Sequence, residues 1–148
     1  MDKLHTRRNT VLYADDDLDD LELVTEAFRE YSSHVKLELV VDGVAAVSYL
    51  RNLPSADPVP CLIILDINMP RLDGKEALRK IRSMDRFREV PVVLFTTSIS
   101  DQDKEFARQF KAGFITKPLN AAQMEMITDQ FLEQCDDEIK RNITRKIQ

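Results

Sequence analysis

Glycine and cysteine are scarce in this chain, with three and two residues respectively among 148. So few glycines leave no phosphate-cradling loop of the kind that a flavin-binding fold would need. The cysteines, Cys61 and Cys135, lie far apart, and their spacing fits neither a disulfide framework nor a metal-ligand motif. We therefore expect two reduced thiols, as is usual in a cytoplasmic protein.

Two kinds of interaction surface are also missing from the sequence. Acidic residues outnumber basic ones by 26 to 21, and no basic stripe indicates a nucleic-acid partner. No apolar run approaches the ~20 residues of a membrane-spanning helix, and the polar residues 1–9 lack the core of a signal peptide. We expect a cytoplasmic protein that binds neither nucleic acid nor membrane.

The sequence is organised around one apolar run that ends on a carboxylate. Residues 62–65 are Leu-Ile-Ile-Leu, and Asp66 follows directly. A run without alternation is typical of a strand buried on both faces, which predicts a parallel sheet covered by helices. Pro70 and Gly74 then mark a turn into the next helix. Asp66 should therefore lie at the carboxyl edge of the sheet, where open α/β folds bind ligands.

The rest of the chain alternates between the periods of strands and helices. Apolar or alternating segments predict five strands, at residues 11–14, 35–41, 62–65, 92–95 and 113–116. Helical spacing predicts five helices, at residues 18–30, 44–53, from 75, 101–110 and from 120. This alternation predicts one doubly wound α/β domain with right-handed crossovers. We assign residues 1–9 to a polar leader, 10–135 to this domain and 136–148 to a helical extension.

Four predicted strands end on groups that can act on phosphate. These groups are the acid pair Asp15 and Asp16, then Asp66, Thr96 and Lys117. Strand ends in a parallel sheet share one rim, where crowded carboxylates repel one another unless Mg²⁺, which prefers oxygen ligands, lies between them. With the metal bound, Asp66 can attack phosphorus while Thr96, Lys117 and the metal each contact a phosphoryl oxygen. The product would be an acyl phosphate on Asp66.

Together these residues resemble the receiver domains of response regulators in two-component signalling, a family that includes bacterial chemotaxis regulators. The resemblance covers about residues 11–131 of the chain. It depends on four motifs in order: Asp15-Asp16, the segment 66–74, Thr96, and Lys117 followed by proline. It implies a flavodoxin-like sheet with strand order 2-1-3-4-5.

The resemblance also implies a role for each matched residue. Asp66 would accept a phosphoryl group from a histidine kinase or a histidine phosphotransfer protein. Asp16 and Asp66 would bind Mg²⁺, Asp15 would act through a metal-bound water, and the Asn68 backbone carbonyl would supply a further ligand. Lys117 would contact the phosphoryl group, and its bond to the following proline would be cis.

Thr96 and Phe114 would form the switch pair of such a domain. On phosphorylation the hydroxyl would move toward the phosphoryl group and the ring would turn inward, although Phe114 could equally be an ordinary core residue. The sequence departs from the family at Phe114, where tyrosine is commoner, at Thr97, where a smaller residue is frequent, and in the shortened loop 110–113. The long connection 52–60 is similar to single-domain regulators that partner phytochrome-like kinases.

Alternatives to this interpretation stay open. Asp15 and its neighbours could simply cap the first helix, and Asp17, Asp19 and Asp20 are interpreted as solvated acids outside the site. A Mg²⁺-dependent phosphohydrolase with an aspartyl nucleophile would want a general acid two residues after the nucleophile, where this chain has asparagine. A third option is a receiver-like scaffold that binds its partner without phosphate.

We predict a phosphoacceptor switch without an output module. It would not be an enzyme, since it would only catalyse its own phosphotransfer and dephosphorylation. Phosphorylation would shift a two-state equilibrium near Thr96, Phe114 and the last helix, and so change the affinity for a downstream protein target. The stripe Ile139, Ile143 and Ile147 would suit a homodimer or partner contact, or it would be a frayed tail.

Overall fold

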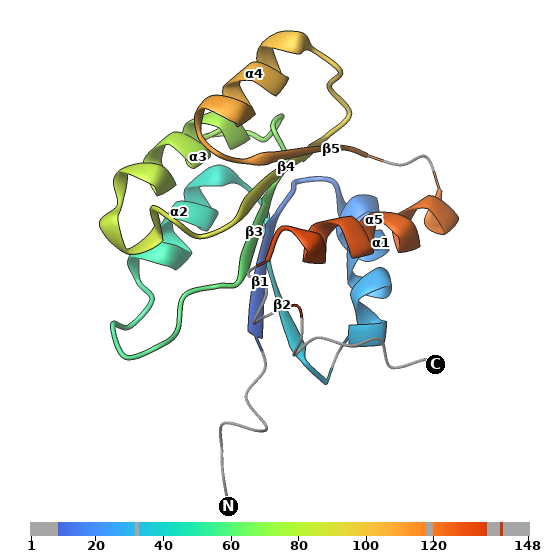
Figure 1. The fold of residues 1–148 in the computed structure, drawn as a ribbon, viewed down its shortest axis with the longest axis horizontal. Helices are drawn as coiled ribbons and strands as arrows, with labels where there is room; N and C mark the ends of the chain where they lie inside the picture. The colour runs from blue at the N-terminus through green and yellow to red at the C-terminus, as the bar shows by residue number, and fades with distance from the viewer. Residues whose placement is uncertain (1–8, 32, 118–119, 136–139, 141–148) are drawn as a thin grey trace, which may run out of the picture.

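The computed structural model describes residues 9–31, 33–117, 120–135 and 140. A parallel sheet with the order β2-β1-β3-β4-β5 forms the middle layer (Figure 1). Its strands are β1 (Asn9–Ala14), β2 (Val35–Val40), β3 (Leu62–Leu65), β4 (Val92–Thr96) and β5 (Gly113–Thr116). The predicted flavodoxin-like fold and its strand order are confirmed.

Helices cover both faces of the sheet (Figure 1). On one face lie α1 (Leu18–Phe28) and α5 (Ala121–Glu133), and on the other lie α2 (Gly43–Arg51), α3 (Gly74–Ser83) and α4 (Asp101–Gln109). Short 3-10 helices, η2 (Arg29–Tyr31) and η3 (Asp85–Phe87), follow α1 and α3. Each face has its own cluster of buried apolar side chains, so the sheet separates two cores.

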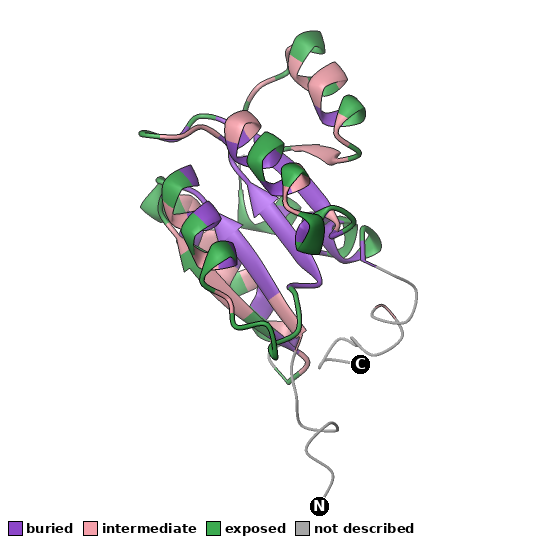
Figure 2. Cartoon of the chain, turned by 90° about the vertical axis from the view of Figure 1, so that its left-hand side faces the viewer, coloured by how far each residue is buried: buried purple, intermediate pink, exposed green. Residues whose placement is uncertain are grey.

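Burial follows the position of each strand in the sheet. Every residue of β3 and β4 is buried, as the unbroken apolar runs predicted, and Figure 2 shows the buried residues gathered along the middle strands. The alternating sequence of β2 is typical of a half-exposed strand near the edge of a sheet, and the structure confirms this position. Leu37 packs against the core, but Leu39 is 42% exposed and Val41, just after the strand, is 50% exposed. The physical reason is that β2 is an edge strand, which pairs with β1 alone.

Acidic and polar side chains fix the point where each helix begins. An oxygen of the residue before each helix accepts a hydrogen bond from a backbone N–H of the first turn. These residues are Asp17, Asp42, Asp73, Ser100 and Asn120. The acids after β1 therefore include a helix cap, Asp17, as one of the alternatives expected.

The long connection between α2 and β3 is held by one arginine. The Arg86 guanidinium donates hydrogen bonds to the carbonyls of Leu53 (2.7 Å), Pro54 (2.8 Å) and Asp57 (2.6 Å). These carbonyls lie outside the strands and helices, and the Pro54 carbonyl also accepts the Asp57 amide (3.0 Å), so the arginine adds donors to the one that the turn supplies.

Some predicted features lie outside the described residues. They are the leader up to residue 8, the proline after Lys117 with its expected cis bond, and the stripe Ile139, Ile143 and Ile147. Among the helices that are described, none has the length and hydropathy needed to cross a membrane.

Candidate functional site

The strand ends bring the predicted residues to one rim of the sheet. The Asp66 amide donates to the Ala14 carbonyl (3.0 Å), which extends the pairing of β1 and β3 by one residue. The Lys117 amide donates to the Thr96 carbonyl (2.8 Å), which does the same for β4 and β5. These backbone hydrogen bonds fix the ends of four neighbouring strands, so the side chains that follow them start from the same edge of the sheet.

Three carboxylates form a cluster at this rim. Asp15, Asp16 and Asp66 each offer an oxygen, and these atoms all lie within 4.8 Å of one another. Asp15 is fully buried and Asp66 is 6% exposed, whereas Asp16 is open to solvent. Asn68 is exposed in the turn after β3. An all-oxygen donor set with one side open to water fits a hard divalent cation such as Mg²⁺ or Mn²⁺.

The ammonium of Lys117 lies among these acids. Its Nζ is 2.8 Å from an Asp15 oxygen and 3.3 Å from an Asp66 oxygen. It is closest to Asp20, at 2.7 Å, although the sequence analysis left Asp20 outside the site. That interpretation was wrong because Asp20, one helical turn after Asp16, faces the strand ends instead of solvent. The pair joins residues 97 positions apart, so only the packing of α1 beside the end of β5 reveals it.

Burial and charge oppose each other in the protonation of this cluster. The pKa of Asp66 is raised to about 6 as the net result of burial, which raises it most, the Lys117 ammonium, which lowers it, and the Asp15 carboxylate, which raises it. Burial also disfavours the charged form of Lys117, but hydrogen bonds to Asp15 and Asp20 outweigh this effect and raise its pKa. Near neutral pH the cluster therefore holds an ionised nucleophile next to a firmly protonated lysine.

Tyr13 is a second residue that the sequence analysis missed. Its hydroxyl donates a hydrogen bond to one Asp15 oxygen, and the other oxygen accepts the Asp17 amide (3.0 Å). Burial and the Asp15 charge raise the pKa of Tyr13, so the phenol stays a donor. In the sequence Tyr13 is only one apolar member of a buried strand, and the position of its hydroxyl depends on side-chain packing.

The hydroxyl of Thr96 connects the rim to α4 and α3. Thr96 is fully buried, and its Oγ1 accepts a hydrogen bond from the Ser98 amide (3.2 Å). The Ser98 hydroxyl donates to Asp103 (2.7 Å), which pairs with the Lys75 ammonium (2.7 Å). Phe114, half-buried on β5, packs against the core beneath α2, α3 and α4. Thr96 and Phe114 thus lie on adjacent strands, and Phe114 pairs with Leu94, two residues before Thr96.

The loop that carries Asp66 into α3 is packed tightly against its surroundings. A Cβ on Gly74 would lie 2.1 Å from the Asp66 carbonyl oxygen, so only glycine allows this approach. Arg71, with a positive φ of 66°, pairs with the buried carboxylate of Asp42. The Gly43 amide donates to the Leu72 carbonyl (3.1 Å). These contacts fasten the loop to the start of α2.

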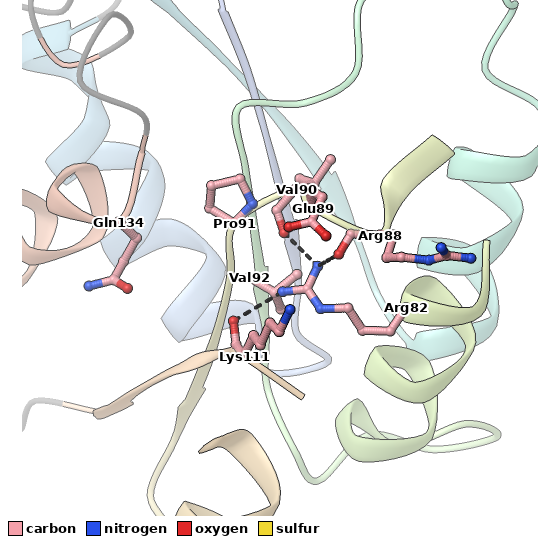
Figure 3. A pocket seen from close by; sticks show the side chains of 8 residues that line it. All are labelled: Arg82, Arg88, Glu89, Val90, Pro91, Val92, Lys111 and Gln134. Carbon is pink, nitrogen blue, oxygen red and sulfur yellow. Dashed lines mark hydrogen bonds between the residues drawn. The ribbon is translucent and has the colours of Figure 1, made fainter. Parts of the chain in front are cut away.

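A hollow of about 220 Å³ lies at the opposite edge of the sheet, near the start of β4 (Figure 3). The Arg82 guanidinium points into it and donates to several backbone carbonyls, those of Phe87, Arg88, Val90, Phe110 and Lys111. The donors of Arg82 are therefore bound to backbone carbonyls of this chain. The hollow lies where α3 packs against the neighbouring loops.

The fold and this rim define a flavodoxin-like domain with a cluster of carboxylates and one lysine at the carboxyl edge of its sheet. The family model for the response regulator receiver domain matches residues 11–129, and the chain belongs to this family. The chain is 32% identical over 113 residues to the probable methanogenesis regulatory protein FilR2 of Methanothrix harundinacea, covering 75% of this chain and 73% of that protein. It is 34% identical over 95 residues to the response regulator Rcp1 of a Synechocystis species, covering 63% and 65%.

Solved structures agree with this assignment. The crystal structure of the phosphorylated cyanobacterial phytochrome response regulator RcpA matches with a TM-score of 0.77 and 28% identity, over 88% of this chain and 98% of that one. The Mn²⁺-bound form of Rcp1 matches with a TM-score of 0.72 and 29% identity, over 86% and 97%. The predicted resemblance to receiver domains, including regulators of the phytochrome type, is confirmed.

Proposed function

We propose that this chain is a phosphoacceptor response regulator in which Asp66 receives a phosphoryl group from a histidine kinase or a histidine phosphotransfer protein. The observation that carries the proposal is the carboxylate of Asp66, buried at the end of β3, 3.3 Å from the Lys117 ammonium and clustered with Asp15 and Asp16. Similarity to RcpA, which has been solved in a phosphorylated form, supports it.

Asp16, Asp66 and the Asn68 backbone carbonyl would hold Mg²⁺, with Asp15 in the outer shell. When bound, the metal supplies positive charge that neutralises the carboxylates and the phosphoryl oxygens. An Asp66 oxygen then forms a bond to phosphorus while the bond from phosphorus to the donor histidine breaks and the imidazole leaves. Lys117 and the Thr96 hydroxyl each stabilise one phosphoryl oxygen.

The response to phosphorylation would be a shift between two conformations. To reach the phosphoryl group, the Thr96 hydroxyl has to leave the Ser98 amide, which it binds at 3.2 Å. Space vacated by Thr96 lets the Phe114 ring turn inward, and the face made by α4, β5 and α5 changes its affinity for a downstream protein. Hydrolysis of the acyl phosphate would end the signal, so that the domain, at residues 10–135, catalyses only reactions of its own phosphoryl group.

The upstream partner we propose is a cytoplasmic kinase of the phytochrome type. Rcp1 and RcpA, which this chain resembles, are named as response regulators, and RcpA is described as a phytochrome response regulator. A homodimer or partner contact through the stripe Ile139, Ile143 and Ile147 stays a prediction from the sequence.

Intact-mass measurement after incubation with Mg²⁺ and acetyl phosphate tests the proposal. The wild type should gain one phosphoryl group, and Asp66→Ala should gain none. Asp101→Asn, which removes an exposed acid at the start of α4, is the matched control and should be labelled like the wild type. Chelation of the metal should prevent labelling.

Two results would contradict the proposal. Rapid multiple-turnover release of phosphate would favour the aspartyl phosphohydrolase. Absence of labelling in the wild type, with a histidine kinase as well as with acetyl phosphate, would favour the scaffold.

A further inference from the structure

We propose that Asp20 is a positioning residue for Lys117: a permanent anionic partner that keeps the ammonium beside Asp66 before and after phosphorylation. This inference rests on the proposed function and adds a residue to it. It starts from the ion pair between Asp20 on α1 and Lys117 after β5, the shortest of the three ion pairs that Lys117 makes in the described part of the chain.

The ammonium of Lys117 is largely buried, so its hydrogen-bond acceptors have to come from the protein and not from water. Only 7% of the side chain is exposed, and Nζ lies 5.9 Å from the centre of the Phe95 ring, so little water reaches it. An ammonium has three N–H donors, and three carboxylates surround this one. A buried charge that loses such partners is costly.

Two of these partners take on other tasks during the proposed reaction. Asp15 and Asp66 belong to the carboxylate cluster that fits a divalent cation, and Asp20 does not. Once the metal binds, Asp15 and Asp66 share their negative charge with it, and phosphorylation converts the Asp66 carboxylate into an acyl phosphate. Asp20 alone keeps an unshared carboxylate for Lys117 in every state.

Asp20 is itself held in place. Its backbone amide donates to the Asp17 side chain (3.2 Å) within the capped first turn of α1. The dipole of α1 stabilises a negative charge at this end of the helix. The side chain is 25% exposed, so it lies at the edge of the site, with its carboxylate directed at Lys117. A fixed anion thus determines where the long lysine side chain ends.

The test compares Asp20→Asn with Asp19→Asn. Asp19 lies in the same helical turn, and its exposed carboxylate is not one of the Lys117 partners in the described residues. Both variants remove one negative charge near the rim, but only the first removes the partner of Lys117. The two readouts are the affinity for Mg²⁺ alone and the affinity for beryllofluoride, a stand-in for the phosphoryl group, at saturating Mg²⁺, both by calorimetry.

We expect Asp20→Asn to weaken beryllofluoride binding roughly tenfold relative to Asp19→Asn, because a neutral amide oxygen holds the ammonium less strongly than a carboxylate does. The Mg²⁺ affinities of the two variants should agree. In a Lys117→Ala background, Asp20→Asn should cause no further loss, since Asp20 acts through Lys117. Thermal unfolding in each background checks that the variants are folded.

The inference is overturned if the two variants bind beryllofluoride equally, or if Asp20→Asn still weakens binding when Lys117 is absent. An equal loss of Mg²⁺ and beryllofluoride affinity in Asp20→Asn would also overturn it, because that pattern indicates a general loss of charge. A wild type that binds no beryllofluoride and accepts no phosphoryl group would instead refute the proposed function itself.

Discussion

At the scale of single residues, the rim is an excess of negative charge around one ammonium. Asp15, Asp20 and Asp66 pair with Lys117, and Asp15 and Asp66 also lie close enough to Asp16 to share an ion with it. Such crowding costs free energy in the folded protein because like charges repel and burial removes water. The same crowding creates the affinity for a divalent cation, so the rim gives up stability for binding.

The cost of burying the Asp66 charge can be measured as the gain in stability, dependent on pH, when a substitution removes this charge. Burial raises the pKa of Asp66 from 3.8 to about 6, so at about pH 3 and below the group is protonated in both the folded and the unfolded state and causes no loss of stability. As the pH rises through 4 to 6 the unfolded chain releases its proton first, and stability falls. In the absence of metal, Asp66→Asn should therefore raise the free energy of unfolding by roughly 1–3 kcal/mol at pH 7.5.

Urea unfolding in the presence of a chelator would give this free energy at pH 7.5 and at about pH 3. The gain from Asp66→Asn should nearly vanish at about pH 3, below the ordinary pKa of an aspartate, and Asp101→Asn, which changes an exposed acid, should show little change at either pH. A destabilised Asp66→Asn at pH 7.5 would mean that attraction to Lys117 outweighs the burial of the charge.

Residues at strand ends could be found in the sequence, whereas residues that reach the site from elsewhere could not. Asp15, Asp66 and Thr96 each follow an apolar run, and the geometry of a parallel sheet then brings them together. Tyr13 and Asp20 contribute through the direction of a side chain inside a strand and inside a helix. That direction depends on how α1 and α5 pack on the sheet, which hydrophobic periodicity does not specify.

At the scale of elements, the turn between β3 and α3 sets the position of the nucleophile. Its backbone touches the strand end at Gly74 and the start of α2 at Gly43. Because these contacts are between backbone atoms, they cannot be relieved by the rotation of a side chain. The turn is therefore rigid where Asp66 begins, and a larger residue at either glycine has to move the main chain.

A pair of glycine substitutions separates this effect from the general cost of adding a methyl group. In Gly74→Ala the new Cβ would lie 2.1 Å from the Asp66 carbonyl oxygen, whereas in Gly113→Ala the nearest atom, 2.9 Å away, belongs to the flexible side chain of Gln134. Gly74→Ala should lower the free energy of unfolding by about 1–3 kcal/mol and reduce labelling of Asp66. Gly113→Ala should lower the free energy of unfolding by less than half as much as Gly74→Ala does. Labelling of Asp66 should be the same as in the wild type.

Urea unfolding and intact-mass analysis after acetyl phosphate would measure both quantities. Equal losses in the two variants would show that the backbone contact at Gly74 has no special role in positioning Asp66.

The central strands were predictable because every residue of β3 and β4 is apolar and buried on both faces. Alternation also indicated that β2 is a half-exposed strand near the sheet edge, but it did not show that Leu39 is one of the exposed residues. The ion pair between Arg71 and Asp42 joins two loops, and no periodic pattern in the sequence predicts such a contact. Prediction thus succeeded where burial imposes a pattern and failed where single polar contacts decide the geometry.

At the scale of the whole molecule, the sheet separates two cores of buried apolar side chains. The core beneath α1 and α5 includes Tyr13, which holds Asp15, while the other core includes Phe114 and the base of α4. The rim is therefore the place where both layers contribute to one site. A ligand that binds there stabilises the molecule as a whole, because the site exists only when both layers are folded.

Binding of Mg²⁺ should therefore appear as an increase in global stability. A ligand that binds only the folded state adds about 2.7 kcal/mol when its concentration is a hundred times the dissociation constant. Urea unfolding with Mg²⁺ at this excess should show that increase over the chelated protein, with an unchanged dependence on urea, since the surface exposed on unfolding is the same. Asp16→Asn should lose most of the increase because it removes the most solvent-accessible carboxylate of the cluster. Asp19→Asn removes a charge outside the cluster and should keep the full increase in stability. If both variants retained the full increase, the cation would be bound elsewhere, and the three acids at the rim would need another explanation.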